Sequence, residues 1–298
     1  MKNRFIVSIF LYGSILLLVA LLGLMRTLNH IHYDNSSTHV STIDLSSSDQ
    51  WVQTFHDDFM GNRLDASKWV TCYDWREPTD NGCTNGGNFE QQWYLSQQVT
   101  VNNGVAVLTA VHEPVTAVSK GGMKTYMYRS GMISTGRPDT KGQVKWSTTY
   151  GYFEARMKFN GGQGVWPAFW LLPTDRTWPP EIDIMEFLGH EKNQILQTNH
   201  WLDSSGRPQK DSSFIQGPNF TQDWHTYAIN WQPGRIDWYV DGELKKTVTG
   251  AEVPNKPMEI IINLAIGGLL PGNAIASTPF PRILQIDWVK VYELKHPL

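Results

Sequence analysis

The sequence has few cysteines, no run of basic residues and no internal repeat. Its 298 residues include only two cysteines, and the formal net charge is −3. Because phosphate binding requires a basic face, the absence of a Lys/Arg run argues against a nucleic-acid partner. No repeat occurs at solenoid or propeller spacing, and no amphipathic helix is evident after residue 50. A neutral or mildly polar ligand fits this composition better.

The two cysteines, Cys72 and Cys83, lie close together in a segment rich in glycine and asparagine. In an oxidising compartment they could form a local disulfide. Two free thiols are the alternative, because sequence spacing alone does not fix geometry. Metal binding by two cysteines with no nearby histidine is not expected. We predict the disulfide.

An apolar stretch at the N-terminus, Phe5 to Met25, is long enough to cross a bilayer as a helix. Lys2 and Arg4 precede it and would stay cytoplasmic. No clear small-x-small cleavage site occurs before His30, which favours an uncleaved membrane anchor over residues 1–26. Cleavage would give a secreted protein instead. In both cases the rest of the chain is expected to be extracytoplasmic.

The remainder of the chain divides into a spacer and one domain. Residues 27–50 are rich in serine and threonine and lack periodicity, which is typical of a linker. About 250 residues follow, a size that one large β domain can fill. We therefore predict a single domain over residues 51–298, and a monomer.

Short runs of alternating apolar residues, separated by Gly, Asn, Asp and Pro, fill this domain. Examples are residues 105–110, 151–159 and 235–240, the last of which runs into the turn Asp241-Gly242. A period of two with hairpin turn signals predicts antiparallel strands. Many short strands must bury one face against another sheet, so we predict an all-β fold, a two-sheet antiparallel sandwich.

Three acids occur within six residues, at Glu181, Asp183 and Glu186. On a regular strand the first two share one face, and Glu186 has the wrong parity to join them. A β-bulge near Met185 is needed to return Glu186 to the acidic face. The two glutamates would then flank one groove position, and two carboxyls about 5–5.5 Å apart are what a retaining glycosidase needs.

Asp183 lies between the two glutamates in this arrangement. It can hydrogen-bond one of them or hold a shared proton, and it would tune the pKa of both. An ordinary edge strand with an exposed polar face is one alternative. A Ca²⁺ or Mg²⁺ site made by the three carboxylates is the other.

Tryptophans crowd the segment just before these acids. The chain has 13 of them, including Trp166, Trp170 and Trp178. Flat apolar rings beside carboxylates suit pyranose sugars, whose C–H faces stack while their hydroxyls seek polar partners. We expect at least one of the three to be buried in the core. We expect no basic group near the acids, which disfavours sulfated or charged polysaccharides.

At this point the sequence resembles glycoside hydrolase family 16, from about Phe55 to Tyr292. The segment from Glu181 to Glu186 matches the family signature with the extra methionine of laminarinase-like, bulged-strand members. The pair Pro179-Pro180 departs from the usual pattern, which often has a glycine there. Further matching stretches are residues 88–94, 150–156, 224–227, 263–268 and 286–292.

The resemblance implies a concanavalin A-like β-jelly roll with a concave substrate cleft. It implies retaining endo-hydrolysis of β-1,3 or mixed β-1,3-1,4 glucan, with Glu181 as nucleophile, Asp183 as its assistant and Glu186 as acid/base. No cofactor is expected for catalysis. A non-catalytic surface glucan-binding protein, and a transglycosylase or galactanase of the same family, are the alternatives. The residues that would line the cleft are Asn88, Trp166, Trp170, His200 and Asn263.

For two of these residues, a purely structural role is the alternative to substrate binding. His200 could be a satisfied strand histidine rather than a partner of the sugar or of Asp183. Asn88 could simply hold its loop together. Asn88 begins one of the matching stretches, whereas His200 lies in Thr198-Asn199-His200-Trp201, outside them.

Many members of the family also carry a structural Ca²⁺ on the convex face. Asp287 matches the acid of the last strand that holds it, and Asp58 and Gly104 are its expected companions. Calcium there would brace the fold rather than act in hydrolysis. The alternative is that Asp287 is an ordinary exposed strand residue.

Overall fold

The computed structural model of the chain describes residues 50–75, 82–119 and 122–295. The predicted anchor and almost all of the predicted linker lie outside these ranges. Within the ranges, no helix is long and apolar enough to cross a membrane. The helices found there are two short 3-10 turns, η2 (Gly86–Asn88) and η3 (Ser96–Gln98).

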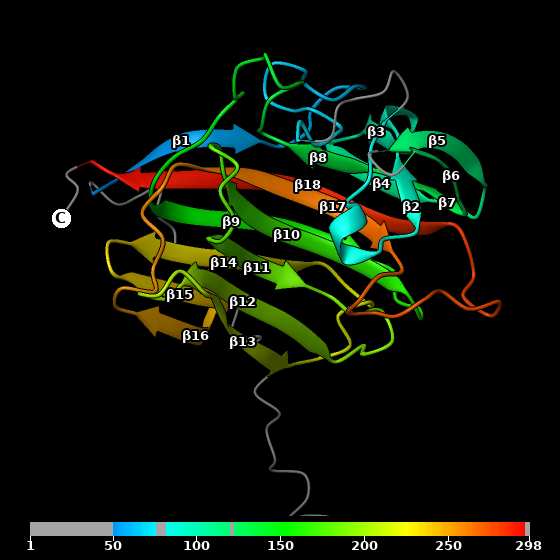
Figure 1. Cartoon of the computed structure of the whole chain (residues 1–298). Helices are drawn as coiled ribbons and strands as arrows, with labels where there is room; N and C mark the ends of the chain where they lie inside the picture. The colour runs from blue at the N-terminus through cyan, green and yellow to red at the C-terminus, as the bar shows by residue number, and fades with distance from the viewer. Residues whose placement is uncertain (1–49, 76–81, 120–121, 296–298) are drawn as a thin grey trace, which may run out of the picture. The chain divides into compact units, whose positions relative to one another are not determined.

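Two large antiparallel sheets pack against each other and form the domain (Figure 1). One sheet has eight strands in the order β16-β15-β14-β9-β18-β4-β3, with β1 also paired to β18. The other has six strands in the order β13-β12-β11-β10-β17-β8. The predicted two-sheet antiparallel sandwich is therefore confirmed.

The strands range from three to 13 residues in length. Those of the eight-stranded sheet are β1 (Trp51–Asp57), β3 (Val99–Asn102), β4 (Val105–Ala110), β9 (Gly151–Phe159), β14 (His225–Gln232), β15 (Arg235–Val240), β16 (Glu243–Thr249) and β18 (Arg282–Leu294). Those of the six-stranded sheet are β8 (Met132–Ser134), β10 (Val165–Pro173), β11 (Glu181–Glu186), β12 (Gln194–Leu202), β13 (Pro208–Gln216) and β17 (Met258–Ile266). Two small sheets pair β2 (Gln92–Tyr94) with β7 (Tyr128–Ser130), and β5 (Val115–Ser119) with β6 (Gly122–Tyr126).

Three strands have the bounds that the alternating pattern predicts, namely β4, β9 and β15. The predicted turn, Asp241-Gly242, joins β15 to β16. Its two residues have φ angles of 51° and 77°. A two-residue hairpin turn of this type requires positive φ at both positions, which asparagine, aspartate and glycine tolerate best. The turn is therefore confirmed as well.

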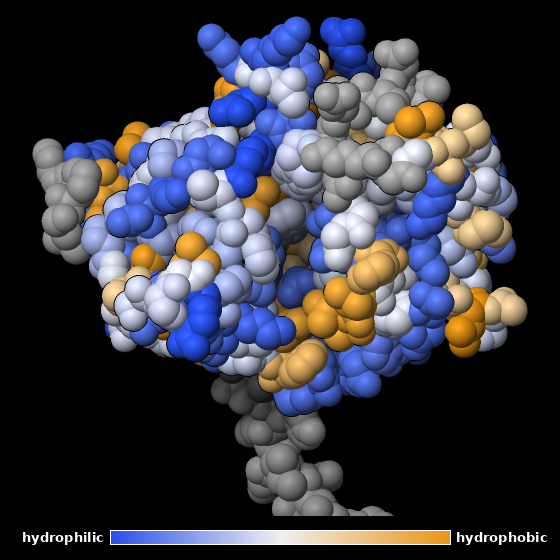
Figure 2. All heavy atoms as spheres, in the orientation of Figure 1, coloured by the Kyte–Doolittle hydropathy of each residue, from blue (hydrophilic) through white to orange (hydrophobic). Residues whose placement is uncertain are grey.

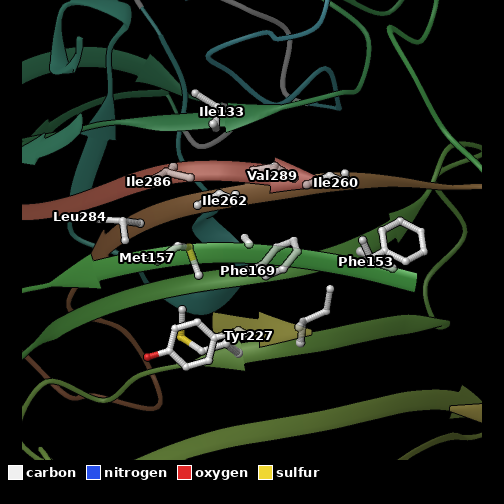
Figure 3. Close-up of a cluster of buried hydrophobic side chains, with 14 of the residues drawn as sticks. Ile133, Phe153, Met157, Phe169, Tyr227, Ile260, Ile262, Leu284, Ile286 and Val289 are labelled. Carbon is white, nitrogen blue, oxygen red and sulfur yellow. The ribbon is translucent and has the colours of Figure 1, made fainter. Parts of the chain in front are cut away.

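The core lies between the two large sheets. Figure 3 shows Phe153 and Met157 of β9 close to Phe169 of β10 and Ile262 of β17. All four side chains are fully buried. Burying a large apolar side chain stabilises a fold by roughly 1.5–3 kcal/mol. Because one face of the six-stranded sheet is used in this way, its other face is free to carry a groove.

Strand β11 carries the bulge that the parity of its acids demands. Opposite β10, Ile184 has no partner, and the register opposite β12 also shifts between Asp183 and Glu186. Ile184 and Met185 are consecutive, and both are fully buried in the core. Two successive inward residues reverse the alternation, so Glu186 returns to the face of Asp183. The predicted bulge is confirmed.

A tryptophan from the other sheet holds this bulge. Trp238 of β15 is fully buried and donates from Nε1 to the main-chain carbonyl of Asp183 at 3.0 Å. A bulge disrupts the ladder, and a buried carbonyl without a partner destabilises the fold. The indole supplies that partner across the core.

Replacing Trp238 with phenylalanine should loosen β11. We expect the free energy of unfolding to fall by about 1–3 kcal/mol, because a buried carbonyl loses its donor. We also expect faster hydrogen exchange along β11, measured by mass spectrometry. The control is Trp231→Phe, which removes a similar buried bond to the carbonyl of Pro254. Equal exchange of β11 in both variants would contradict this explanation.

Candidate active site

A cleft of about 640 Å³ lies on the outer face of the six-stranded sheet. Side chains of β10, β11, β12, β13 and β17 form its floor, and loops form its walls. Figure 2 shows the surface hollowed near the middle of this view, with hydrophobic residues along one side of the hollow. Leu269 and Leu270, which follow β17, are exposed hydrophobic residues that line the cleft.

The structure brings the predicted catalytic and substrate residues to this one cleft. Their side chains come from β10, β11, β12 and β17 and from the loop at η2. Their roles in catalysis and substrate binding stay predictions, because a place in the cleft does not by itself show what a residue does. The residues are Asn88, Trp166, Trp170, Glu181, Asp183, Glu186, His200 and Asn263.

Glu181 and Asp183 share a histidine partner. His200 lies opposite Glu181 in the register of β11 and β12. Its Nε2 is 3.1 Å from Oδ2 of Asp183 and 3.9 Å from Oε1 of Glu181. The pairing of the strands therefore places the ring beside both acids. Of the two alternatives for His200, the structure has the one in which it contacts Asp183.

Two indoles donate to the glutamates. Nε1 of Trp178 is 2.9 Å from Oε2 of Glu181, and Nε1 of Trp166 is 3.1 Å from Oε1 of Glu186. Each bond favours the ionised carboxylate that accepts it. Trp166 is 6% exposed while Trp178 is 56% exposed. The expectation that at least one of the clustered tryptophans is buried is confirmed.

The three acids perturb one another. Burial raises the pKa of Glu181 well above its usual range, and the charges of Asp183 and Glu186 add to the shift. Burial likewise raises the pKa of Glu186, the charge of Asp183 adds to it, and the cation of Lys210 opposes it. Like charges held together cannot all ionise at once, so the cluster keeps a proton to higher pH than an isolated carboxyl would.

A chain of hydrogen bonds links lining residues of the cleft, from Trp170 to Glu90. Trp170 Nε1 donates to Asn263 Oδ1 at 2.8 Å, and Asn263 Nδ2 donates to the Tyr94 hydroxyl at 3.0 Å. Tyr94 in turn lies 3.2 Å from Oε2 of Glu90. Asn88 Nδ2 donates to the other oxygen of Glu90 at 3.3 Å. Asn88 therefore holds its loop as well as lining the cleft.

Two basic side chains also line the cleft, so the expectation of none near the acids is wrong. Lys210 of β13 lies opposite His200 in the register of the β12–β13 hairpin. Arg176 arrives from the loop after β10, where it pairs with Asp74 and Glu259. Lys210 could have been found by counting residues across the hairpin. Arg176 depends on a loop conformation that no sequence pattern indicated.

The predicted disulfide shapes one wall of the cleft. Cys72 and Cys83 are joined in the structure. Tyr73 and Trp75, which lie between them in sequence, line the cleft and stack on each other with ring centroids 4.2 Å apart. Neither ring was expected at the site, because this segment lies upstream of the stretches that match the family.

The residues predicted to hold structural calcium are partly brought together. A Cβ added to Gly104 would be 3.7 Å from the carbonyl oxygen of Asp58. The carboxylate of Asp287 forms an ion pair with Arg156 of β9. That cation already neutralises the acid, so the three residues do not fit a preformed anionic calcium site. Calcium stays a prediction, and no step below depends on it.

The acidic cluster offers a second set of metal-type donors. Glu181, Asp183 and His200 each present a ligand atom, all within 4.8 Å of one another. Trp178 already donates to Glu181, and His200 contacts Asp183. These hydrogen bonds occupy the same donor atoms that a metal ion would use. The alternative of a Ca²⁺ or Mg²⁺ site made by the three carboxylates stays a prediction.

Comparison with known proteins places the chain in a class. The sequence profile of Glycosyl hydrolases family 16 matches residues 87–290. The solved catalytic domain of an endo-1,3-beta-glucanase (laminarinase) from Thermotoga petrophila RKU-1 superposes with a TM-score of 0.69 at 31% identity, over 83% of this chain and 99% of that one. The chain therefore belongs to glycosyl hydrolases family 16, and the jelly-roll fold is confirmed.

Curated relatives agree with this class. The chain is 33% identical over 262 residues to Endo-1,3-1,4-beta-glycanase ExsH of Rhizobium meliloti, which covers 81% of this chain and 52% of the relative. It is 32% identical over 271 residues to Beta-glucanase of Rhodothermus marinus, covering 81% of this chain and 85% of the relative. The chain thus spans about half the length of the Rhizobium protein.

Glu90 should make the free energy of unfolding depend on pH. Burial raises its pKa from 4.5 to about 7, although Gln92, Asn88 and Tyr94 donate to it. The folded chain therefore holds a proton that the unfolded chain releases, so stability falls as pH rises through this window. In Glu90→Gln we expect this decline to shrink by up to about 3 kcal/mol. Urea denaturation between about pH 5 and pH 7 measures it.

Glu154 of β9 serves as the comparison, because burial raises its pKa to about 7 on the outer face of the other sheet. Glu154→Gln should flatten the same decline independently, and the double variant should flatten it further. Lost hydrogen bonds would shift the whole curve without changing its slope. A wild-type slope in Glu90→Gln would show that another group titrates.

Proposed function

We propose that this chain is a retaining endo-glycoside hydrolase that cleaves β-1,3 or mixed β-1,3-1,4 glucan. The observation that carries the proposal is the bulge in β11, which sets Glu181 and Glu186 on one face of the cleft with Asp183 between them. Membership of the family supports the reaction. The names of the relatives, an endo-1,3-1,4-β-glycanase, a β-glucanase and a laminarinase, support the substrate.

In the first step, Glu181 attacks the anomeric carbon while Glu186 gives its proton to the glycosidic oxygen. The bond to the leaving sugar breaks, and a glycosyl ester of Glu181 forms. The raised pKa of Glu186 keeps that proton bound to higher pH than an isolated carboxyl would. Trp178 donates to Glu181 and favours its ionised, attacking form.

In the second step, water replaces the departed sugar. Glu186, now a carboxylate, accepts a proton from the water, whose oxygen attacks the anomeric carbon and releases Glu181. Two inversions at one carbon restore the starting configuration. Asp183, whose Oδ2 lies 3.1 Å from Nε2 of His200, stays in place between the two glutamates through both steps.

The place of action is part of the proposal. The apolar N-terminal stretch would either anchor the domain to a membrane or direct its secretion, and both leave the domain outside the cytoplasm. We also propose that the domain acts as a monomer. The Cys72–Cys83 disulfide suits an oxidising compartment. A polysaccharide outside the cell is too large to enter it without prior cleavage. An enzyme that cleaves such a polymer is therefore expected outside the cytoplasm.

Substituting the two glutamates separates their roles. We expect Glu181→Gln to reduce reducing-end release from laminarin and barley glucan below detection, because no nucleophile remains. Glu186→Gln should lower kcat by about 10²–10⁴-fold through loss of the proton donor. Glu243→Gln, an exposed position in β16, is the matched control and should retain full activity. Near wild-type activity in either of the first two would overturn these roles. An inactive wild type that still binds glucan would support a non-catalytic binding protein.

The stereochemistry of the first-formed product tests the double displacement independently. Retention predicts the β-anomer as the initial reducing end released from a β-glucan, followed by slow mutarotation. Proton NMR during the first minutes of hydrolysis distinguishes the two anomers. An α-anomer at the start would mean that water attacks directly and that Glu181 is not a nucleophile.

A further inference from the structure

The loop between β10 and β11, residues 174–180, is held by several side-chain bonds. Asp175 Oδ1 accepts from the backbone N of Thr177 at 3.0 Å and from its hydroxyl at 2.7 Å. Lys256 Nζ reaches Asp175 Oδ2 at 2.9 Å and the Thr177 hydroxyl at 2.7 Å. The loop therefore presents the next residue, Trp178, in a fixed place.

Arg176 fixes the same loop from the other side. It has a φ of 64°, in the left-handed region that non-glycine residues seldom occupy. Its Nε lies 2.6 Å from Oδ1 of Asp74, and its guanidinium also pairs with Glu259. Both partner carboxylates are buried. Such contacts offset the strain of an unfavourable backbone conformation, and strained residues of this kind cluster at functional sites.

Packing in the core does not explain why residue 178 is a tryptophan. Its side chain is 56% exposed, so it adds little to the core. Its indole lines the cleft, and the ring centroid lies 6.0 Å from that of His200. The N–H, which water could satisfy, points instead at Oε2 of Glu181 at 2.9 Å. A hydrogen bond to a charged acceptor is roughly twice as strong as a neutral one.

Two prolines, Pro179 and Pro180, connect Trp178 to Glu181. Proline has no backbone N–H, so neither residue can donate to the carboxylate that follows. The indole of Trp178 does donate to that carboxylate.

We infer that Trp178 is a positioning residue for the nucleophile. Its N–H holds Oε2 of Glu181 and leaves Oε1 as the atom that attacks the anomeric carbon, and the exposed ring face supports the sugar in the cleft. The inference rests on the proposed function. In the first step the bond from Oε1 to the anomeric carbon forms while the bond to the leaving oxygen breaks, and Glu186 supplies the proton. Trp178 takes no proton and makes no covalent bond.

Two variants separate the N–H from the ring. Trp178→Phe keeps an aromatic face and removes the donor, whereas Trp178→Ala removes both. For Trp178→Phe we expect kcat on laminarin to fall about 10–100-fold, which is the size of a lost hydrogen bond to a charged group. We expect KM to stay within about threefold, since the ring face remains. For Trp178→Ala we expect the same loss in kcat and a further rise in KM.

The pH profile supplies the readout that a merely structural role would not move. Glu181 must be ionised to attack, and the indole N–H lowers its pKa against the effect of burial. Without the donor, the acidic limb of the kcat/KM profile should move to higher pH. Trp288→Phe on the convex sheet, where Lys290 lies over the ring, is the control and should leave the limb unmoved. Site-specific replacement of Trp178 by 3-benzothienylalanine keeps the indole shape and substitutes sulfur for the N–H, and it should reproduce the shift seen in Trp178→Phe.

Wild type and Glu181→Gln measured in the same assay distinguish the two ways of failing. An inactive wild type, or an active Glu181→Gln, overturns the proposed function and the inference with it. An active wild type and an inactive Glu181→Gln, together with wild-type kcat and acidic limb in both Trp178→Phe and the benzothienyl protein, overturn the inference alone. A lowered melting temperature with unchanged kcat and limb would also overturn it, because it would make Trp178 a structural residue only.

Discussion

The bulge in β11 is the constraint on which the rest of the site depends. A strand alternates its side chains strictly, so Asp183 shares the face of Glu181, whereas Glu186, five positions on, can join them only if the strand has an extra residue. Ile184 and Met185 both enter the core and provide that extra residue. The core packing of two apolar side chains and the bond from Trp238 thus determine where Glu186 points. In this strand, the burial of two apolar side chains and the orientation of the acids therefore have the same cause.

Around that strand, the protein balances burial of the acids against donors aimed at them. Burial raises the pKa of both glutamates, and indole N–H groups from Trp166 and Trp178 oppose it. His200 contacts Asp183 from the neighbouring strand. Glu90, which also lines the cleft, repeats the pattern, because three side chains donate to its buried carboxyl. A cleft built this way keeps its carboxyl groups protonated to higher pH than isolated carboxyls would be.

Patterns local in sequence predicted the local parts of the structure well. The alternation of apolar residues predicted the bounds of β4, β9 and β15. The positions of the three acids predicted the bulge in β11 from the sequence alone. What was missed depends on contacts between distant segments. Lys210 reaches the cleft only because β13 returns along β12, and Arg176 only because Asp74 and Glu259 hold its loop. The Arg156 partner of Asp287 likewise required knowing which strands are neighbours.

The central claim is that Glu181 bears the sugar during turnover, and covalent trapping tests it most directly. In a 2-deoxy-2-fluoro β-glucosyl fluoride, the 2-fluorine slows both steps by destabilising their oxocarbenium-like transition states, while the fluoride leaving group keeps the first step fast enough for the ester to accumulate. Mass spectrometry of the peptides should then find the sugar on Glu181, with none in Glu181→Gln. A sugar attached to Glu186, or rapid turnover to an α-product with no trapped ester, would contradict the account.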